Sequence, residues 1–230
     1  LYYSRKESTM TEKFIKLAVT AAMMGSLGAS VNAVAADGFY AGAKVQSSTF
    51  GHELQRNTAD AANPSITTYA EETDAAVGVF LGYKTHVTDD AFVAAEVFYN
   101  AENSQTTNIN NMLQTQLELE SSYGVNFKAG VDVTNRFSVY GIAGATWLDF
   151  DIHNSYPFAP PMRSGDASEA GLSLGAGFEY QLDNQWSVKG EYIQIKDVGF
   201  DPLPEVAIPG KINPNEVDYD SLSIAVSYSF

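Results

Sequence analysis

The sequence predicts an all-β fold: an eight-stranded antiparallel transmembrane β-barrel with up-and-down meander connections. Three observations support this prediction. Proline-free segments alternate apolar residues with small or polar ones at period 2, short turns alternate with long polar stretches, and the polar face of the segments carries glycines and charged residues. Short turns at one end and long connections at the other are typical of outer-membrane barrels.

Eight segments follow the pattern. They lie near residues 38–48, 73–85, 91–101, 120–131, 136–149, 168–181, 185–196 and 221–230. The last is the clearest, because apolar residues from Leu222 to Phe230 alternate with small residues from Ser221 to Ser229. Short turns are predicted near residues 88–90, 132–135 and 182–184.

Four polar stretches between these segments are predicted to be long loops, near residues 49–72, 101–119, 150–168 and 197–218. All 8 prolines lie within these stretches. Proline cannot donate to a β-ladder, so its confinement separates loops from strands.

The orientation of the barrel follows from the non-apolar face. A soluble eight-stranded barrel or sandwich is the alternative, and its apolar face would point inward. Glycine weakens a strand on an outer surface, whereas the narrow lumen of eight strands needs small residues. The glycines in question are Gly42, Gly78, Gly82, Gly130, Gly144 and Gly177. We therefore predict that the apolar face meets lipid and that the lumen holds Lys44, Lys84, Glu96, Lys128, Glu179, Lys189 and Glu191.

The N-terminal region resembles a targeting signal. Residues 10–35 have a charged start, an apolar stretch at 17–27 and the sequence Ala33-Val34-Ala35, which predicts a signal peptide cleaved after Ala35. An uncleaved anchor is the alternative, but the apolar stretch is about half the length of a bilayer span. Residues 1–9 precede the first methionine and are interpreted as an upstream extension, which leaves 36–230 as the barrel domain.

Charge and composition limit the function. The chain has 28 acidic and 13 basic residues, a net charge of −15 and no cysteine. This charge argues against nucleic acid as a partner, because phosphates require a basic surface. The acidic cluster Glu71-Glu72-Asp74 lacks the spacing of a defined calcium loop, and the three histidines fall in different connections, so no metal or other cofactor is predicted.

One short motif is a candidate catalytic site. His153-Asn154-Ser155 could pair a base with a nucleophile. The motif is predicted to lie in a loop beside Pro157 and not on a strand at membrane depth. We therefore predict no enzymatic activity, and a lipid A-modifying esterase is the least favoured of the functions considered.

Several segments resemble the transmembrane barrel of the OmpA family of Gram-negative outer-membrane proteins. The segments are Phe39–Lys44 for its first strand, Val125–Gly130 through Val139-Tyr140 for its fourth and fifth, Gly177–Tyr180 for its sixth and Ser221–Phe230 for its eighth. The resemblance implies a location in the bacterial outer membrane. It also implies that Glu96, Lys128, Glu179 and Lys189 form internal salt bridges, and that Phe230, with Tyr228, is the signal read by the barrel-assembly machinery.

Two departures from the family are visible. Ile142 stands where a lumenal arginine is expected, so the ion network should be thinner. The chain stops at Phe230, without the family's peptidoglycan-binding domain, so a tether to the cell wall is not expected.

We therefore predict an outer-membrane barrel with a structural or porin-like role and four long acidic extracellular loops. An adhesin, or a receptor for phage or host contact through those loops, is the alternative. The expected partners are outer-membrane lipid and lipopolysaccharide, with the assembly machinery and periplasmic chaperones during biogenesis. A lumen filled by side chains argues against a wide pore, and we expect a Lys128–Glu179 ion pair to cross it.

Overall fold

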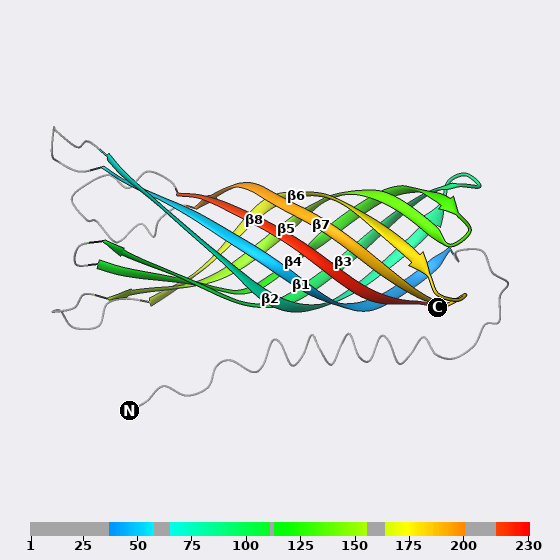
Figure 1. The fold of residues 1–230 in the computed structure, drawn as a ribbon, viewed down its shortest axis with the longest axis horizontal. Coiled ribbons are helices and arrows are strands. Elements are labelled where there is room, and N and C mark those ends of the chain that lie inside the picture. Colours follow the sequence, from blue (N-terminus) through cyan, green and yellow to red (C-terminus); the bar gives the residue numbers. More distant parts are fainter. Residues whose placement is uncertain (1–36, 58–64, 111–112, 156–163, 201–214) are drawn as a thin grey trace, which may run out of the picture.

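The computed structural model describes residues 37–57, 65–110, 113–155, 164–200 and 215–230. It confirms the predicted fold class, a closed antiparallel barrel with its eight strands in sequence order (Figure 1). The strands are β1 (Gly38–Asn57), β2 (Ser65–His86), β3 (Ala91–Asn110), β4 (Leu113–Thr134), β5 (Phe137–Ser155), β6 (Ser164–Gln181), β7 (Trp186–Phe200) and β8 (Asn215–Ser229). The predicted signal peptide and upstream extension lie outside the described residues.

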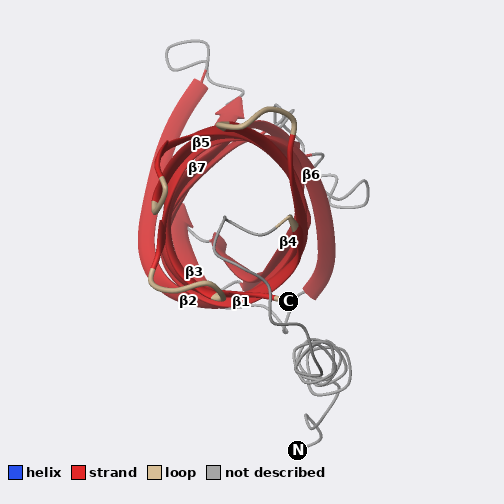
Figure 2. Cartoon of the chain, turned by 90° about the vertical axis from the view of Figure 1, so that its right-hand side faces the viewer, coloured by secondary structure: helices blue, strands red, loops and turns tan. Residues whose placement is uncertain are grey.

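The ring closes between the first and last strands. Tyr40 of β1 lies opposite Ser229 of β8, and the strands form a continuous ring when viewed along the barrel (Figure 2).

Short turns join β2 to β3, β4 to β5 and β6 to β7, as predicted. In the last of these turns, the backbone N–H groups of Gln185 and Trp186 donate to Asp183 and hold the pKa of its carboxyl below the ordinary value. Within the described residues, no helix has the length and apolar character needed to cross a membrane.

The apolar face of the strands points outward. On β8, Leu222, Ile224 and Val226 are 61%, 62% and 45% exposed, whereas Ser223 and Ala225 between them are buried. The same alternation runs around the barrel. Apolar side chains facing out and small or polar ones facing in is the arrangement of a barrel in lipid.

Aromatic residues mark both ends of the apolar band. Near the short turns, the rings of Phe39 and Tyr83 meet edge to face with centroids 5.1 Å apart. Toward the other end, Tyr123 and Trp147 stack with centroids 6.0 Å apart. Such aromatic girdles lie at the two membrane–water interfaces.

The strands are longer than predicted. β2 and β4 have 22 residues each, about twice the 9–11 that cross a bilayer, and much of the predicted loop sequence is strand. The predicted segments correspond to the membrane-embedded part of each strand. Outside the membrane the outer face meets water instead of lipid, so the outward apolar alternation ends while the hydrogen-bonded ladder continues. The strands still contain none of the 8 prolines.

Two seams open in the wall on the side opposite the short turns. Pairing of β2 with β3 ends at Val77 and Ala101, and pairing of β6 with β7 ends at Leu172 and Lys196. Beyond these points the wall divides into two four-stranded sheets. We call β7-β8-β1-β2 the first leaf and β3-β4-β5-β6 the second leaf. Figure 1 shows the ends of β1 and β2 well apart from those of β3 to β6.

An apolar cluster lies between the leaves. It consists of Phe50 and Ile195 from the first leaf with Leu119, Leu148 and Phe150 from the second, each at most 2% exposed. The rings of Phe50 and Phe150 have centroids 5.5 Å apart. Burial of such side chains contributes roughly 1.5–3 kcal/mol each, so the cluster holds the leaves together and fills the space between them.

Candidate functional site

All seven charged residues predicted to face the lumen have side chains buried inside the barrel. Their exposed fractions are 7% for Lys44 and Lys84, 6% for Glu179 and Glu191, 4% for Lys128 and Lys189, and 3% for Glu96. Buried charges require ionic or hydrogen-bonding partners. The arrangement of those partners decides whether the interior is open.

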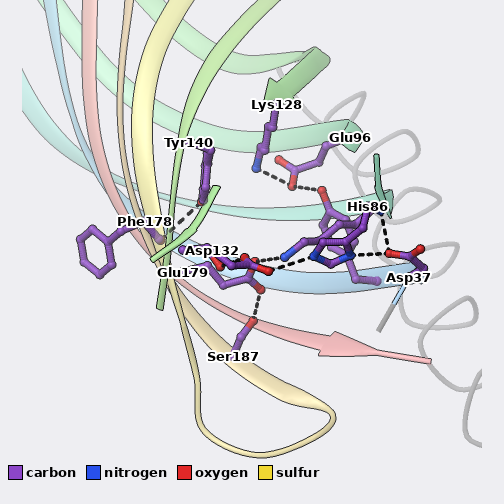
Figure 3. Close-up of polar contacts among 12 residues, drawn as sticks. Asp37, His86, Glu96, Lys128, Asp132, Tyr140, Phe178, Glu179 and Ser187 are labelled. Atoms are coloured by element: carbon purple, nitrogen blue, oxygen red, sulfur yellow. Dashed lines mark hydrogen bonds and ion pairs between the residues drawn. The ribbon is translucent and has the colours of Figure 1, made fainter. Parts of the chain in front are cut away.

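Lys128 of β4 is the centre of the network. Its Nζ lies 2.7 Å from Oε2 of Glu96 on β3 (Figure 3). The same Nζ lies 2.6 Å from Oε1 of Glu191 on β7, so Lys128 joins opposite sides of the wall. Tyr40 donates to Glu96 at 3.0 Å, and Tyr140 donates to Glu191 at 2.7 Å. The barrel is therefore crossed at this level by a continuous set of ionic contacts.

The expected Lys128–Glu179 pair is wrong. Oε2 of Glu179 lies 3.4 Å from Nζ of Lys84, and its Oε1 accepts a hydrogen bond from Ser187 at 2.6 Å. The relative stagger of the strands places this group closer to the short turns than Lys128. The alternation along each strand predicted that both side chains point into the lumen, but it carries no information about their positions along the barrel axis.

Two lysines in the interior rest on aromatic rings instead of carboxylates. Nζ of Lys189 lies 3.8 Å from the ring centroid of Tyr40, and Nζ of Lys44 lies 4.7 Å from that of Phe98. Among the described residues, neither ammonium has a carboxylate within salt-bridge distance. Cation–π contacts therefore hold them. For Lys189, the contact with the ring of Tyr40 stands in place of the salt bridge that the resemblance implied.

The inward glycines make room for these rings. A Cβ on Gly82 would overlap the ring of Tyr40, and a Cβ on Gly42 would overlap that of Phe80. Glycine at these two positions is thus explained sterically, because a larger residue would overlap an aromatic ring. The rings occupy the space in the lumen that the glycines leave open.

Glu102 is a buried charge that the sequence analysis missed, because it falls in a stretch predicted to be a loop. Its carboxylate accepts hydrogen bonds from Gln46 at 2.9 Å and from Ser48, Ser122 and Tyr219 at 2.8 Å each. Four neutral donors satisfy the carboxylate without a cation. Continuing the inward parity of Glu96 along β3 would have indicated it.

The described interior is balanced in charge. Its buried acids are Glu96, Glu102, Glu179 and Glu191, and its buried bases are Lys44, Lys84, Lys128 and Lys189. The seven residues predicted for the lumen include four lysines and three glutamates, and the burial of Glu102 balances that excess of lysine in this part of the chain.

A charged clamp lies at the rim near the short turns. His86 ends β2, with Nδ1 2.6 Å from Oδ1 of Asp37 and Nε2 2.9 Å from Oδ2 of Asp132 on β4 (Figure 3). Both ring nitrogens can donate only in the imidazolium form. Burial acts to raise the pKa of Asp37, but the hydrogen bonds from His86 outweigh it and hold that pKa below the ordinary value. The clamp ties the start of β1 to β2 and β4.

The other two histidines lie on strands and not in loops. His52 is on β1, and the His153-Asn154-Ser155 motif ends β5; their side chains lie outside the described part of the structure. Among the described residues, no group of three or more histidine, aspartate or glutamate side chains is placed to hold a metal ion.

The predicted assembly signal lies at the closing edge of the barrel. The ring of Tyr228 meets those of Trp186 and Phe230, with centroids 5.0 and 5.3 Å away. The N–H of Phe230 donates to the carbonyl oxygen of Phe39 at 3.0 Å. The role of these residues in assembly stays a prediction.

Comparison with known proteins places this geometry in a family. Residues 18–230 match the outer membrane protein beta-barrel domain. The chain belongs to this family. The expected kinship with small outer-membrane barrels is thus confirmed, and the protein is an outer-membrane β-barrel of the Gram-negative type.

Relatives within the family are distant. The chain is 24% identical over 161 residues to a 31 kDa outer-membrane immunogenic protein of Brucella melitensis, a match that covers 66% of this chain and 65% of the relative's length. Among solved structures, it is similar to Ail, the attachment invasion locus protein of Yersinia pestis, with 13% identity, a TM-score of 0.47 and coverage of 85% of this chain and 100% of that one. The outer-membrane protease OmpT of Escherichia coli has 8% identity, a TM-score of 0.48 and coverage of 87% and 99%.

Proposed function

We propose that this barrel is a closed membrane anchor that carries its two leaves outside the membrane as a contact surface for a partner, and that it is not a pore. The observation that carries the proposal is the filling of the barrel at two successive levels. The ionic contacts of Lys128 cross the membrane-embedded part, and the apolar cluster of Phe50, Leu119, Leu148, Phe150 and Ile195 fills the space between the leaves.

Strand length supports the contact half of the proposal. At about 3.3 Å per residue, the 22 residues of β4 extend for about 70 Å. A barrel strand tilted by about 40° needs only about half of that length to cross the apolar band. The remaining half continues as hydrogen-bonded sheet outside the membrane. These parts of the strands are not needed to span the membrane, yet they form a regular sheet. They are therefore suited to presenting a surface to another molecule.

The closed state is tested by conductance. Refolded protein is inserted into planar lipid bilayers and, separately, into liposomes for solute-driven swelling, with a general porin as the positive control. We expect no steady conductance and no swelling with small sugars. A stable, reproducible channel current would overturn the proposal and favour the porin-like role.

The contact half is tested on cells. Bacteria displaying the protein are compared with bacteria displaying a version in which the β1–β2 and β3–β4 hairpins are shortened to the ends of the membrane band. We expect the shortened version to reach the outer membrane at equal levels and to lose adhesion to host cells or adsorption of phage. Unchanged adhesion and adsorption would overturn the contact role.

A further inference from the structure

The edge of β2 above the first seam has hydrogen-bonding groups without a strand partner. From Ser65 to Ala76, β2 pairs with β1 on one side, while on the other side its pairing with β3 begins only at Val77. In an antiparallel strand, every second residue directs its N–H and C=O toward a given neighbour. About half of the residues of this edge therefore present both groups to an open side. Such an edge binds extended polypeptide as an added strand.

The side chains along the edge give it a charge pattern. Glu72 and Asp74 have the inward parity of Ala76, so they face the mouth between the leaves, and Glu72 is exposed there. Thr73 and Ala75 lie on the outer face and are uncharged. Glu71 precedes these residues, but its side chain lies outside the described part of the structure. An added strand would therefore meet negative charge at Glu72 and Asp74, two residues apart on its inward face.

We propose that the free edge of β2, residues 65–76, binds an extended cationic segment of a partner protein as a fifth strand of the first leaf, with lysine or arginine at every second position opposite Glu72 and Asp74. The proposal rests on the contact function and names the chemistry of the partner. Oppositely charged residues directly across a β-ladder stabilise the pairing, and like charges destabilise it.

Two other occupants fit the edge less well. A second copy of the chain pairing through the same edge would bring Glu72 and Asp74 of both copies onto one face of a joint sheet, where they repel. The chain's own segments 156–163 and 201–214 carry seven of its prolines, and proline lacks the N–H that an added strand must donate. A cationic segment of another protein meets neither obstacle.

The experiment uses the protein in lipid nanodiscs and a fluorescent peptide of alternating lysine and threonine. Two control peptides have the same composition: one has its lysines in a single block, and the other has every second backbone amide methylated. We expect the alternating peptide to bind at least about tenfold more tightly than either control. Its binding should slow the hydrogen exchange of about half of the amides in residues 66–76.

Charge reversal supplies matched variants. Glu72→Lys with Asp74→Lys should weaken binding of the alternating peptide at least about tenfold. Asp89→Lys with Asp90→Lys, a reversal of two exposed acids in the turn at the opposite end, should leave binding unchanged. Heat-modifiable gel mobility confirms that both variants are folded barrels.

Three results would overturn the inference: equal binding of the methylated peptide, no binding of any peptide, or binding that survives the reversal at Glu72 and Asp74. The first would show that cations adsorb to the surface without strand pairing. These outcomes are separate from the conductance test, because a barrel that conducts can still be scored for peptide binding at its edge.

Discussion

Removal of the Lys128 ammonium is expected to destabilise the barrel strongly. Its Nζ is in direct contact with two buried carboxylates, 2.7 Å from Glu96 and 2.6 Å from Glu191. Lys128→Met leaves both carboxylates without their cation in a water-poor interior. Breaking a buried ion pair in this way costs about 3–5 kcal/mol, and the loss of a cation shared by two carboxylates should lie at the upper end of that range.

Double-mutant cycles identify the partners. Lys128→Met combined with Glu96→Gln, or with Glu191→Gln, should be less destabilised than the sum of its single changes, with a coupling energy of about 1–3 kcal/mol. Lys128→Met combined with Glu179→Gln should be additive to within about 0.5 kcal/mol, because Glu179 contacts Lys84 instead. The free energy of unfolding is measured by urea titration of barrels refolded into lipid vesicles.

The cycle with Glu179 is the internal control. Coupling to Glu179 as large as that to Glu96 would show that the lumenal contacts are arranged differently. Near-zero coupling in all three cycles would mean that water screens the charges, and the interior would then be hydrated enough to contradict the closed anchor.

Three further predictions concern the outer face, the rim and assembly. Ile224→Arg, in the middle of the apolar band, should lower the unfolding free energy by about 2–4 kcal/mol, whereas Asp218→Arg, beyond the band, should change it little; equal costs in the same urea titration would refute the orientation. Because the pKa of Asp37 is lowered in the folded barrel, its contribution to stability is complete above the unfolded pKa and is lost as pH falls through the folded one. Thermal unfolding in acid should therefore show a smaller loss in His86→Ala than in the parent, and identical acid profiles would show that the clamp contributes nothing. Deletion of Phe230 should reduce folded protein in the outer membrane while leaving refolding in vitro nearly intact, and normal surface levels would rule out its role as an assembly signal.

The sequence alone predicts which side chains of each strand point outward and which part of each strand crosses the membrane. It does not predict which residues contact one another across the interior. Period-2 alternation is a local property, so Leu222 and Ser223 reveal their directions from their neighbours alone. The pairing of Lys128 with Glu191 depends on the stagger of β4 relative to β7, which is a property of the closed ring and not of any one segment.

The apolar cluster was hidden for a related reason. Trp147 and Leu148 are adjacent and both apolar, so alternation cannot say which of them faces inward; the structure directs Trp147 to the outside and buries Leu148 completely. Glu102 was misplaced because a polar sequence outside the membrane looks like a loop even where the ladder continues. Leu148 and Glu102 both lie near or beyond the edge of the membrane, where the outer face no longer has to be apolar and the period-2 alternation is lost.

The division into two leaves has a consequence for the order in which the protein is built. The second leaf consists of four consecutive strands, β3 to β6, joined by hairpins, and its contacts are local in sequence. The first leaf contains the junction of β1 with β8, which joins the two ends of the barrel domain. Contacts between distant parts of a chain form late, because a long loop must close first. The free edge of β2 therefore belongs to a sheet that is complete only after the ring has closed, so a partner that requires the whole first leaf would bind mature barrels and pass over unfinished ones.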